Sequence, residues 1–218
     1  MLKQLRYNSR EAAINDHKEN YRSSGWAKGK FSKDGPDRLR YARIISPIPE
    51  WSLVLDIGCN DGTVGHFLRH DKGCTVYGLD VVDELVTQAQ TRGLIARVGC
   101  AEEIPFISNK FQAVIMAEVM EHLFDPADGL REIHRVLRPD GVFVGSVPHP
   151  DGGMGHKHHN GGDYHQRIFE TEELEGVLRQ FFHAVTITPT PYNPIWCEKN
   201  NVPKDMAQWN VWECRGLI

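Results

Sequence analysis

The stretch Val54-Leu55-Asp56-Ile57-Gly58-Cys59-Asn60-Asp61-Gly62 decides the fold class of this 218-residue chain. An apolar run meets an acidic residue and then two glycines four positions apart. Residues 63–68 can start a helix, so the stretch predicts a strand, a tight turn and a helix. Glycine at such a turn permits positive φ, and the helix N-terminus offers free N–H groups to a ligand. The stretch therefore predicts a binding site for a small polar molecule.

The glycine spacing indicates which kind of ligand this turn binds. A dinucleotide site needs the pattern G-x-G-x-x-G. At the second and third glycine positions this chain has Asn60 and Thr63. Asp56 and Asp61 would also repel a pyrophosphate. A cationic or zwitterionic ligand that carries a ribose fits the turn better.

These residues resemble the first motif of the class I S-adenosylmethionine-dependent methyltransferases (type 11-like), in which an acidic residue precedes x-G-x-G-x-G. Asn60 stands at the middle glycine of the motif, and asparagine tolerates left-handed backbone angles. The resemblance implies that S-adenosylmethionine is the cofactor. Taken alone, the motif also fits an ordinary strand-to-helix turn of another α/β protein.

Three further elements follow in the order of that family. Asp80 ends the second predicted strand about twenty positions after the turn, where a carboxylate can accept hydrogen bonds from both ribose hydroxyls. As an alternative, Asp80 caps the next helix. Residues 98–106 resemble G-D-A-E-x-L-P-F, with Cys100 in place of the acid, and 137–141 resemble the structural turn L-K-P-G-G.

The resemblance implies a cofactor site built from the ends of four strands. Val81 would pack beside the adenine, and the backbone of Ala101 and the side chain of Glu102 would serve the adenine edge. The full set of cofactor-binding candidates is Asp56, Gly58, Cys59, Asn60, Gly62, Asp80, Val81, Ala101, Glu102, Ala117 and Glu118.

Strand and helix signals alternate from residue 51 onward, which predicts an α/β fold with a doubly wound, Rossmann-like, mostly parallel sheet. Ligands then bind at the carboxyl ends of the strands. The resemblance adds a seven-stranded sheet with an antiparallel C-terminal hairpin. The expected strands are 53–57, 75–79, 95–98, 113–117, 142–146, 183–188 and 209–214, and the expected helices are 63–70, 83–91, 127–137 and 171–180, with a Pro- and Asn-rich connection at 189–208.

Residues 1–50 are polar and predict an N-terminal helical extension, or lid, before a methyltransferase domain at 51–218. One helix is expected to start after Asn8 or Ser9, and a second to span 36–45. In the family this segment often folds over the cofactor. Three aromatic residues of the extension either do so here or pack it onto the core, namely Tyr21, Trp26 and Phe31.

Composition excludes several classes of protein. Hydrophobic residues make up 40% and charged residues 25% of the chain, as in soluble globular proteins. A net charge of −4 argues against a broad nucleic-acid-binding face. No apolar run approaches the roughly 20 residues of a membrane span, and the N-terminus lacks an apolar signal core, so a cytoplasmic location is expected. The five cysteines are odd in number and form no C-x-x-C pair, which predicts reduced thiols. Oligomeric state stays open.

Two carboxylates and an imidazole follow the strand 113–117. If residues 118–122 form one helical turn, Glu118, Glu121 and His122 share a face and suit a divalent ion such as Mg²⁺ or Mn²⁺. The pattern E-x-x-E-H resembles the metal-binding element of the small-RNA terminal 2′-O-methyltransferases and of the ubiquinone-pathway O-methyltransferases. The ion would lower the pKa of a substrate hydroxyl. Without a metal, the carboxylates cap a helix and His122 lines the substrate pocket.

The segment 149–165 is rich in glycine and holds five of the eleven histidines. Loops of this length are usually functional or disordered, and an imidazole can act as a general base or a metal ligand. His165 precedes an F-E pair, as in the RNA enzymes, so the resemblance makes it the fourth metal ligand. His149 is a further catalytic candidate. A solvated histidine cluster on the surface is the alternative.

The sequence thus predicts an S-adenosylmethionine-dependent O-methyltransferase for a small hydroxylated molecule, such as a sugar or a natural-product intermediate. Glu121, His122 and one of the histidines His149 and His165 would deprotonate or polarise this acceptor. RNA terminal methylation is the alternative, and the acidic charge balance opposes it. A non-catalytic protein that keeps the fold is a further alternative, although the acidic and glycine residues of the cofactor motifs occur together here. The broken glycine pattern opposes a nucleotide oxidoreductase.

Overall fold

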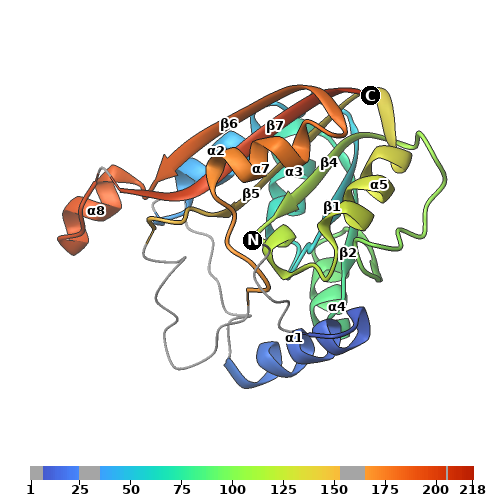
Figure 1. Cartoon of the computed structure of the whole chain (residues 1–218), viewed down its shortest axis with the longest axis horizontal. Coiled ribbons are helices and arrows are strands. Elements are labelled where there is room, and N and C mark those ends of the chain that lie inside the picture. Colours follow the sequence, from blue (N-terminus) through green and yellow to red (C-terminus); the bar gives the residue numbers. More distant parts are fainter. Residues whose placement is uncertain (1–6, 25–34, 153–164, 205) are drawn as a thin grey trace.

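A single mixed sheet runs through the computed structural model, which describes residues 7–24, 35–152, 165–204 and 206–218 (Figure 1). The strand order is β3-β2-β1-β4-β5-β7-β6. β1 to β5 pair in parallel, whereas β7 pairs antiparallel with both β5 and β6. This confirms the predicted seven-stranded sheet with an antiparallel C-terminal hairpin. The strands are β1 Leu53–Ile57, β2 Thr75–Asp80, β3 Ile95–Val98, β4 Phe111–Ala117, β5 Leu137–Pro148, β6 Phe182–Pro191 and β7 Ala207–Leu217.

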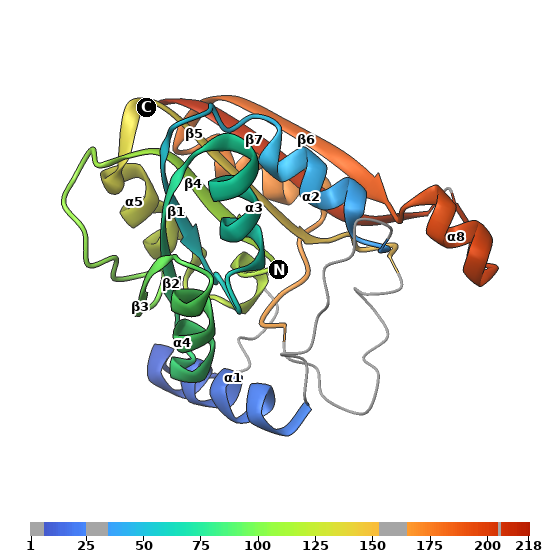
Figure 2. The same ribbon diagram turned by 180° about the vertical axis from the view of Figure 1, so that it is seen from behind.

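Helices cover both faces of the sheet. α2, α3 and α4 lie on the face shown in Figure 2, and α5 and α7 lie on the face shown in Figure 1. The pleat of β1 explains this division, because Val54 packs on the side of α2 to α4 while Leu55 packs on the side of α5 and α7. The helices are α1 Arg10–Ser24, α2 Arg38–Ile45, α3 Thr63–Lys72, α4 Asp83–Thr91, α5 Pro126–Val136, α7 Thr171–Leu178 and α8 Pro194–Asn200.

The connection between the last two strands holds a helix that the sequence analysis missed. α8 lies within the Pro- and Asn-rich connection 189–208, for which no helix was predicted. Asn193 precedes it and accepts a hydrogen bond from the N–H of Ile195, and Pro194 occupies the first turn. Asparagine followed by proline is a helix-start signal.

The N-terminal extension crosses the edge of the sheet where the parallel strands end. Ser9 caps α1, as expected, because its hydroxyl accepts a hydrogen bond from the N–H of Ala12. Figures 1 and 2 both place α1 below the carboxyl ends of β1 and β2, beside α4. The side chain of Tyr21, together with Trp26 and Phe31, falls outside the described residues. The division of the chain at residue 50 stays a prediction.

In the part of the chain that the structure describes, no helix combines the length and the apolar character that a membrane span requires.

Candidate functional site

The turn after β1 has the backbone of a ligand cradle. Gly58, Asn60 and Gly62 have φ values of 68°, 49° and 82°, so all three are left-handed. This confirms that asparagine can take the place of the middle glycine. A Cβ at Gly58 would lie 2.2 Å from the Cγ2 atom of Val119, and one at Gly62 would lie 2.8 Å from the Cα atom of Ala89. The two glycines are therefore needed for close packing as well as for backbone conformation.

Asp80 ties this turn to the second strand. Its two carboxylate oxygens accept hydrogen bonds from the N–H groups of Asn60 and Val82, each at 2.9 Å. Each oxygen keeps a second lone pair for a ligand hydroxyl. Burial raises the pKa of Asp80 despite these bonds. Through Val82, Asp80 fixes the backbone directly before α4, and through Asn60 it fixes the turn after β1.

Asp56 lies deeper in the same site. It is 3% exposed, and its Oδ2 atom has no hydrogen-bond partner. Burial, and then the charge of Asp80, raises the pKa of Asp56 to about 7. A buried carboxylate without a partner is unfavourable unless a donor or cation reaches it. The ammonium group of an amino acid ligand would meet that need.

The remaining cofactor candidates contribute in different ways. Cys59 is buried, and its thiol lies against Gly78, so only its backbone can face a ligand. Ala101 is also buried, in the core cluster below α5. Glu102 is half-buried, and burial raises its pKa. Val81 and Ala117 are half-buried at the ends of their strands.

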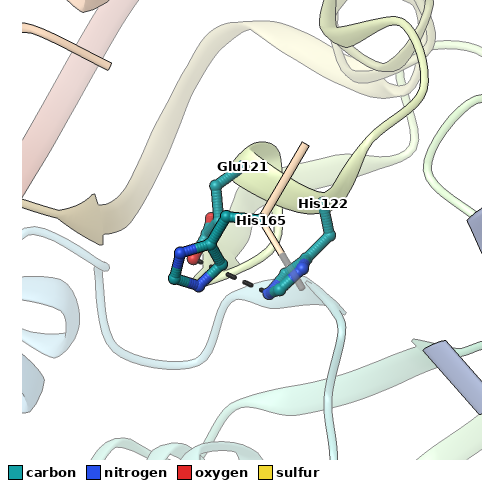
Figure 3. Close-up of side chains that lie close together, drawn as sticks. All are labelled: Glu121, His122 and His165. Atoms are coloured by element: carbon teal, nitrogen blue, oxygen red, sulfur yellow. Dashed lines mark ion pairs between the residues drawn. The ribbon is translucent and has the colours of Figure 1, made fainter. Parts of the chain in front are cut away.

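A three-residue cluster lies at the end of β4. The ligand atoms of Glu121, His122 and His165 all lie within 4.8 Å of one another (Figure 3). Glu121 is 1% exposed, and neither of its carboxylate oxygens has a hydrogen-bond partner. Burial, and then the charge of Glu118, raises the pKa of Glu121 well above its usual value. His122 Nε2 is 3.9 Å from its Oε1 atom.

Local contacts explain how His165 reaches a residue more than forty positions earlier in the chain. The N–H of Gln166 donates to the backbone oxygen of Glu121 at 2.8 Å. The Arg167 guanidinium donates to the backbone oxygen of Phe124 at 3.0 Å. Phe169 is 2% exposed and anchors the segment in the core. The His122 and His165 rings then lie with their centroids 4.9 Å apart.

The expected helical turn at 118–122 is not present. The structure has a 3₁₀ helix, η2, only at Met120–His122, and Glu118 lies outside it with φ of 56°. The reason is that the N–H of Glu118 still donates to Ser146 of β5, which continues the sheet ladder by one residue. The Glu118 carboxylate consequently accepts a hydrogen bond from the Ser146 hydroxyl at 2.8 Å and is absent from the three-residue cluster.

His149 forms hydrogen bonds with other residues than those of the cluster. Its N–H donates to Gln208 of β7, and its Nδ1 atom accepts from the N–H of Asp151. The other histidines of the glycine-rich segment, at positions 156, 158 and 159, lie outside the described residues. The catalytic roles of His149 and His165 stay predictions.

Comparison with known proteins agrees with this geometry. Residues 55–145 match a family model described as a methyltransferase domain. An uncharacterized methyltransferase of Mycobacterium tuberculosis is 38% identical over 90 residues, which is 40% of this chain and 36% of that protein. The mitochondrial arginine-hydroxylase NDUFAF5 of Danio rerio is 27% identical over 135 residues, which is 58% of this chain and 42% of that protein. The chain thus spans less than half the length of the curated relatives it matches.

A solved structure shows the same fold. The geranyl diphosphate C-methyltransferase of Streptomyces coelicolor A3(2), in complex with Mg²⁺, geranyl-S-thiolodiphosphate and S-adenosylhomocysteine, aligns with a TM-score of 0.62 at 13% identity. The alignment covers 82% of this chain and 74% of that one. Residues 55–145 thus match the methyltransferase domain family, and the fold agrees with that of class I S-adenosylmethionine-dependent methyltransferases.

The residues of the methyltransferase domain fit the methyl donor. The left-handed turn carries no side chain at Gly58 and Gly62, Asp80 offers further lone pairs for ribose hydroxyls, and the Asp56 oxygen without a hydrogen-bond partner suits an ammonium group. The unpartnered Glu121 carboxylate beside two imidazoles likewise fits a divalent cation.

Two further residues of the site escaped the sequence analysis. His17 of α1 has its ring 5.1 Å from that of His122, and its pKa is lowered by burial although the charges of Asp80 and Asp16 oppose this. Arg40 of α2 is 7% exposed and lies 3.7 Å from the Glu118 carboxylate. Both precede the residues 55–145 that match the methyltransferase family model. No sequence motif marks them, because their burial depends on how the extension packs.

Proposed function

We propose that this protein is an S-adenosylmethionine-dependent O-methyltransferase that acts on a small hydroxylated molecule. The observation that carries the proposal is the Glu121 carboxylate, which is buried without a hydrogen-bond partner beside His122 and His165. The cluster follows β4, next to the turn at residues 58–62 that follows β1 and that we call the donor turn. An acceptor bound between them would meet both groups.

The protein's own residues would bind and align the two substrates. The Gly58 turn and Asp80 would hold the nucleoside, and Asp56 would hold the amino acid end of the donor. S-adenosylmethionine supplies an activated methyl group when bound, so the enzyme mainly needs to position a nucleophile and remove its proton. His122 and His165, which are both half-buried, are placed to accept that proton.

A divalent ion fits the same cluster and would favour oxygen as the acceptor atom. Glu121, His122 and His165 would hold it, and Glu118 would not, in contrast to the four-ligand set expected from the sequence. Such an ion lowers the pKa of a hydroxyl bound to it. Two imidazoles and one carboxylate leave open coordination positions for the acceptor.

Two alternatives use the same site. RNA terminal 2′-O-methylation is opposed by the net charge of −4, since RNA binding calls for clustered basic residues. Two observations favour hydroxylation. Two histidines and one carboxylate are the ligand set of non-haem iron oxygenases, and one relative is named an arginine-hydroxylase. A non-catalytic role is opposed by the intact donor turn. The cytoplasmic location stays a prediction.

Donor binding tests the methyltransferase proposal directly. We expect calorimetry to detect binding of S-adenosylhomocysteine and not of NAD. Asp80→Asn should weaken the binding about tenfold to hundredfold, as expected when one charged hydrogen-bond acceptor is lost. Asp71→Asn, an exposed position on α3, is the control and should bind normally. No binding of S-adenosylhomocysteine at about 1 mM would reject the proposal.

Metal dependence tests the oxygen acceptor. Chelation should abolish methyl transfer, and so should Glu121→Gln or His165→Ala, while all of these leave S-adenosylhomocysteine binding intact. Full activity in the presence of chelator would leave the histidines as the only bases. The acceptor should be sought among hydroxylated metabolites, free arginine and a short RNA with a free 2′-hydroxyl. Mass spectrometry of the product distinguishes a gained methyl group from a gained oxygen atom.

A further inference from the structure

Arg40 is a buried cation from the N-terminal extension. It lies on α2, and its guanidinium carbon is 4.7 Å from the ring centroid of Tyr41 and 5.0 Å from that of Trp209. Such stacking suits the flat guanidinium group and would not suit a lysine equally. One end of the guanidinium is 3.5 Å from Asp37. Two rings and a carboxylate thus fix its plane.

The other end of the guanidinium faces the end of the sheet. Arg40 Nη1 is 3.7 Å from Glu118 Oε1 and 3.5 Å from the Ser146 hydroxyl. The same hydroxyl donates to Glu118 Oε1 at 2.8 Å. A cation and a hydroxyl therefore hold one oxygen of Glu118. This explains why the Glu118 carboxylate is not part of the cluster of Glu121, His122 and His165.

Arg40 and Glu118 differ in how exposed their side chains are. The Arg40 side chain is 9% exposed and the Glu118 side chain is 24% exposed. A ligand can therefore reach Glu118 more easily than Arg40. Glu118 also borders the donor turn, because its neighbour Val119 packs directly against Gly58.

We infer that Arg40 is a positioning residue, which holds the Glu118 carboxylate where it can bind the methyl donor. In this arrangement Glu118 accepts a hydrogen bond from the ammonium group of the donor, and Arg40 with Ser146 keeps it out of the metal cluster. The inference rests on the proposed function, since it assumes that the donor turn binds S-adenosylmethionine. It removes Glu118 from the set of metal ligands.

The test compares donor and metal binding in the same variants by calorimetry, with S-adenosylhomocysteine and with Mn²⁺. Arg40→Met and Glu118→Gln should each weaken S-adenosylhomocysteine binding about tenfold to hundredfold. The double variant should bind S-adenosylhomocysteine about as well as the single variant with the lower affinity. The reason is that both substitutions remove the same interaction between Arg40 and Glu118. Binding of Mn²⁺ should change less than donor binding in each variant, because Glu118 supplies no ligand atom to the cluster.

Matched variants separate positioning from a structural role. Arg40→Lys keeps the charge and should restore part of the donor affinity. Arg43→Met makes the same substitution at an exposed position of α2 and should change neither affinity. If Arg40→Met does not fold, the Glu118→Gln and double variants carry the comparison, since the double variant leaves neither charge buried alone.

Three results would overturn the inference. Donor affinity could be unchanged in Arg40→Met, the losses could add in the double variant, or Mn²⁺ binding could weaken while donor binding does not. The last result would return Glu118 to the metal site. Failure of the proposed function would appear earlier, as wild-type protein that does not bind S-adenosylhomocysteine, and the inference would fall with it.

Discussion

Asp56 shows how a single side chain couples this site to pH. Its carboxylate is buried in β1 and has one oxygen without a partner. Burial and the charge of Asp80 raise its pKa from 3.8 to about 7. Between these values the folded protein binds a proton that the unfolded chain has released. The stability from this group is therefore complete below about pH 4 and is lost as the pH rises toward 7.

We predict that Asp56→Asn flattens the pH dependence of stability. In the wild type, Asp56 alone should lower the free energy of unfolding by about 1.4 kcal/mol per pH unit over this window. Urea unfolding at pH 5 and pH 8 measures the effect in the absence of ligand. The variant should lose less stability than wild type, and Asp71→Asn should behave as wild type. An equal loss in all three proteins would contradict the assigned pKa.

The site residues differ in how far the sequence could predict them. The left-handed turn at Gly58 to Gly62 and the position of Asp80 follow from local motif chemistry, and the structure agrees with both. The direction of the Glu118 side chain could not be predicted. It depends on Ser146 of β5 and Arg40 of α2, which the fold alone brings together.

At the scale of secondary structure, β5 depends on one glycine. A Cβ at Gly145 would lie 2.0 Å from the backbone oxygen of Met116 in β4 and 2.3 Å from the Trp212 ring of β7. The three neighbouring strands β4, β5 and β7 therefore close around a position with no side chain. Neighbouring strands are about 4.8 Å apart whatever the sequence, so the backbone cannot easily move aside.

We predict that Gly145→Ala destabilises the protein by about 1–3 kcal/mol through overpacking. Gly176→Ala is a matched control on α7, because no atom lies within 4 Å of its added Cβ. This control should stabilise the helix by about 0.5–1 kcal/mol. Chemical denaturation measures both. Equal effects of the two substitutions would mean that the strands tolerate the extra methyl group.

Elements with strong periodicity were predicted closely, and irregular ones were not. The strand at 53–57 and the helix at 83–91 match β1 and α4 in both bounds. No helix was predicted at α8, and the helical turn expected at 118–122 is a 3₁₀ helix only at Met120–His122, η2. Both are short, and short helices depend on caps and on tertiary contacts more than on periodicity. The register of β5 against β7 is likewise a property of the assembled sheet.

At the scale of the whole molecule, α1 covers the edge of the sheet that carries the site. A cavity of about 10 Å³ remains there, lined by Tyr7, Ala13, Asp16, His17, His122 and Gln166. Arg10 of α1 and Glu103 form an ion pair at 3.4 Å in which both side chains are exposed. Exposed pairs contribute little to stability. A bound donor beneath α1 would add contacts that the free protein lacks.

We predict that S-adenosylhomocysteine slows amide hydrogen exchange in residues 11–19 of α1. The reason is that a ligand bound at the carboxyl ends of β1 and β2 would contact α1, which lies over those ends (Figure 1). α8 lies at the far end of the molecule (Figure 1) and should exchange at the same rate with and without ligand. Unchanged or faster exchange in α1 would show that the extension does not close over the donor.

The sequence alone determined the class of fold and the donor turn, because strand periodicity, glycine conformation and a strand-end carboxylate are local properties of the chain. Tertiary structure alone decided which groups share the chemistry. His165 reaches Glu121 and His122 through the Gln166 and Arg167 contacts, and Glu118 turns toward Arg40 and Ser146. These pairings join residues far apart in the chain. Which side chains meet depends on burial and on neighbouring charges. Both are fixed only after the N-terminal extension has packed onto the sheet.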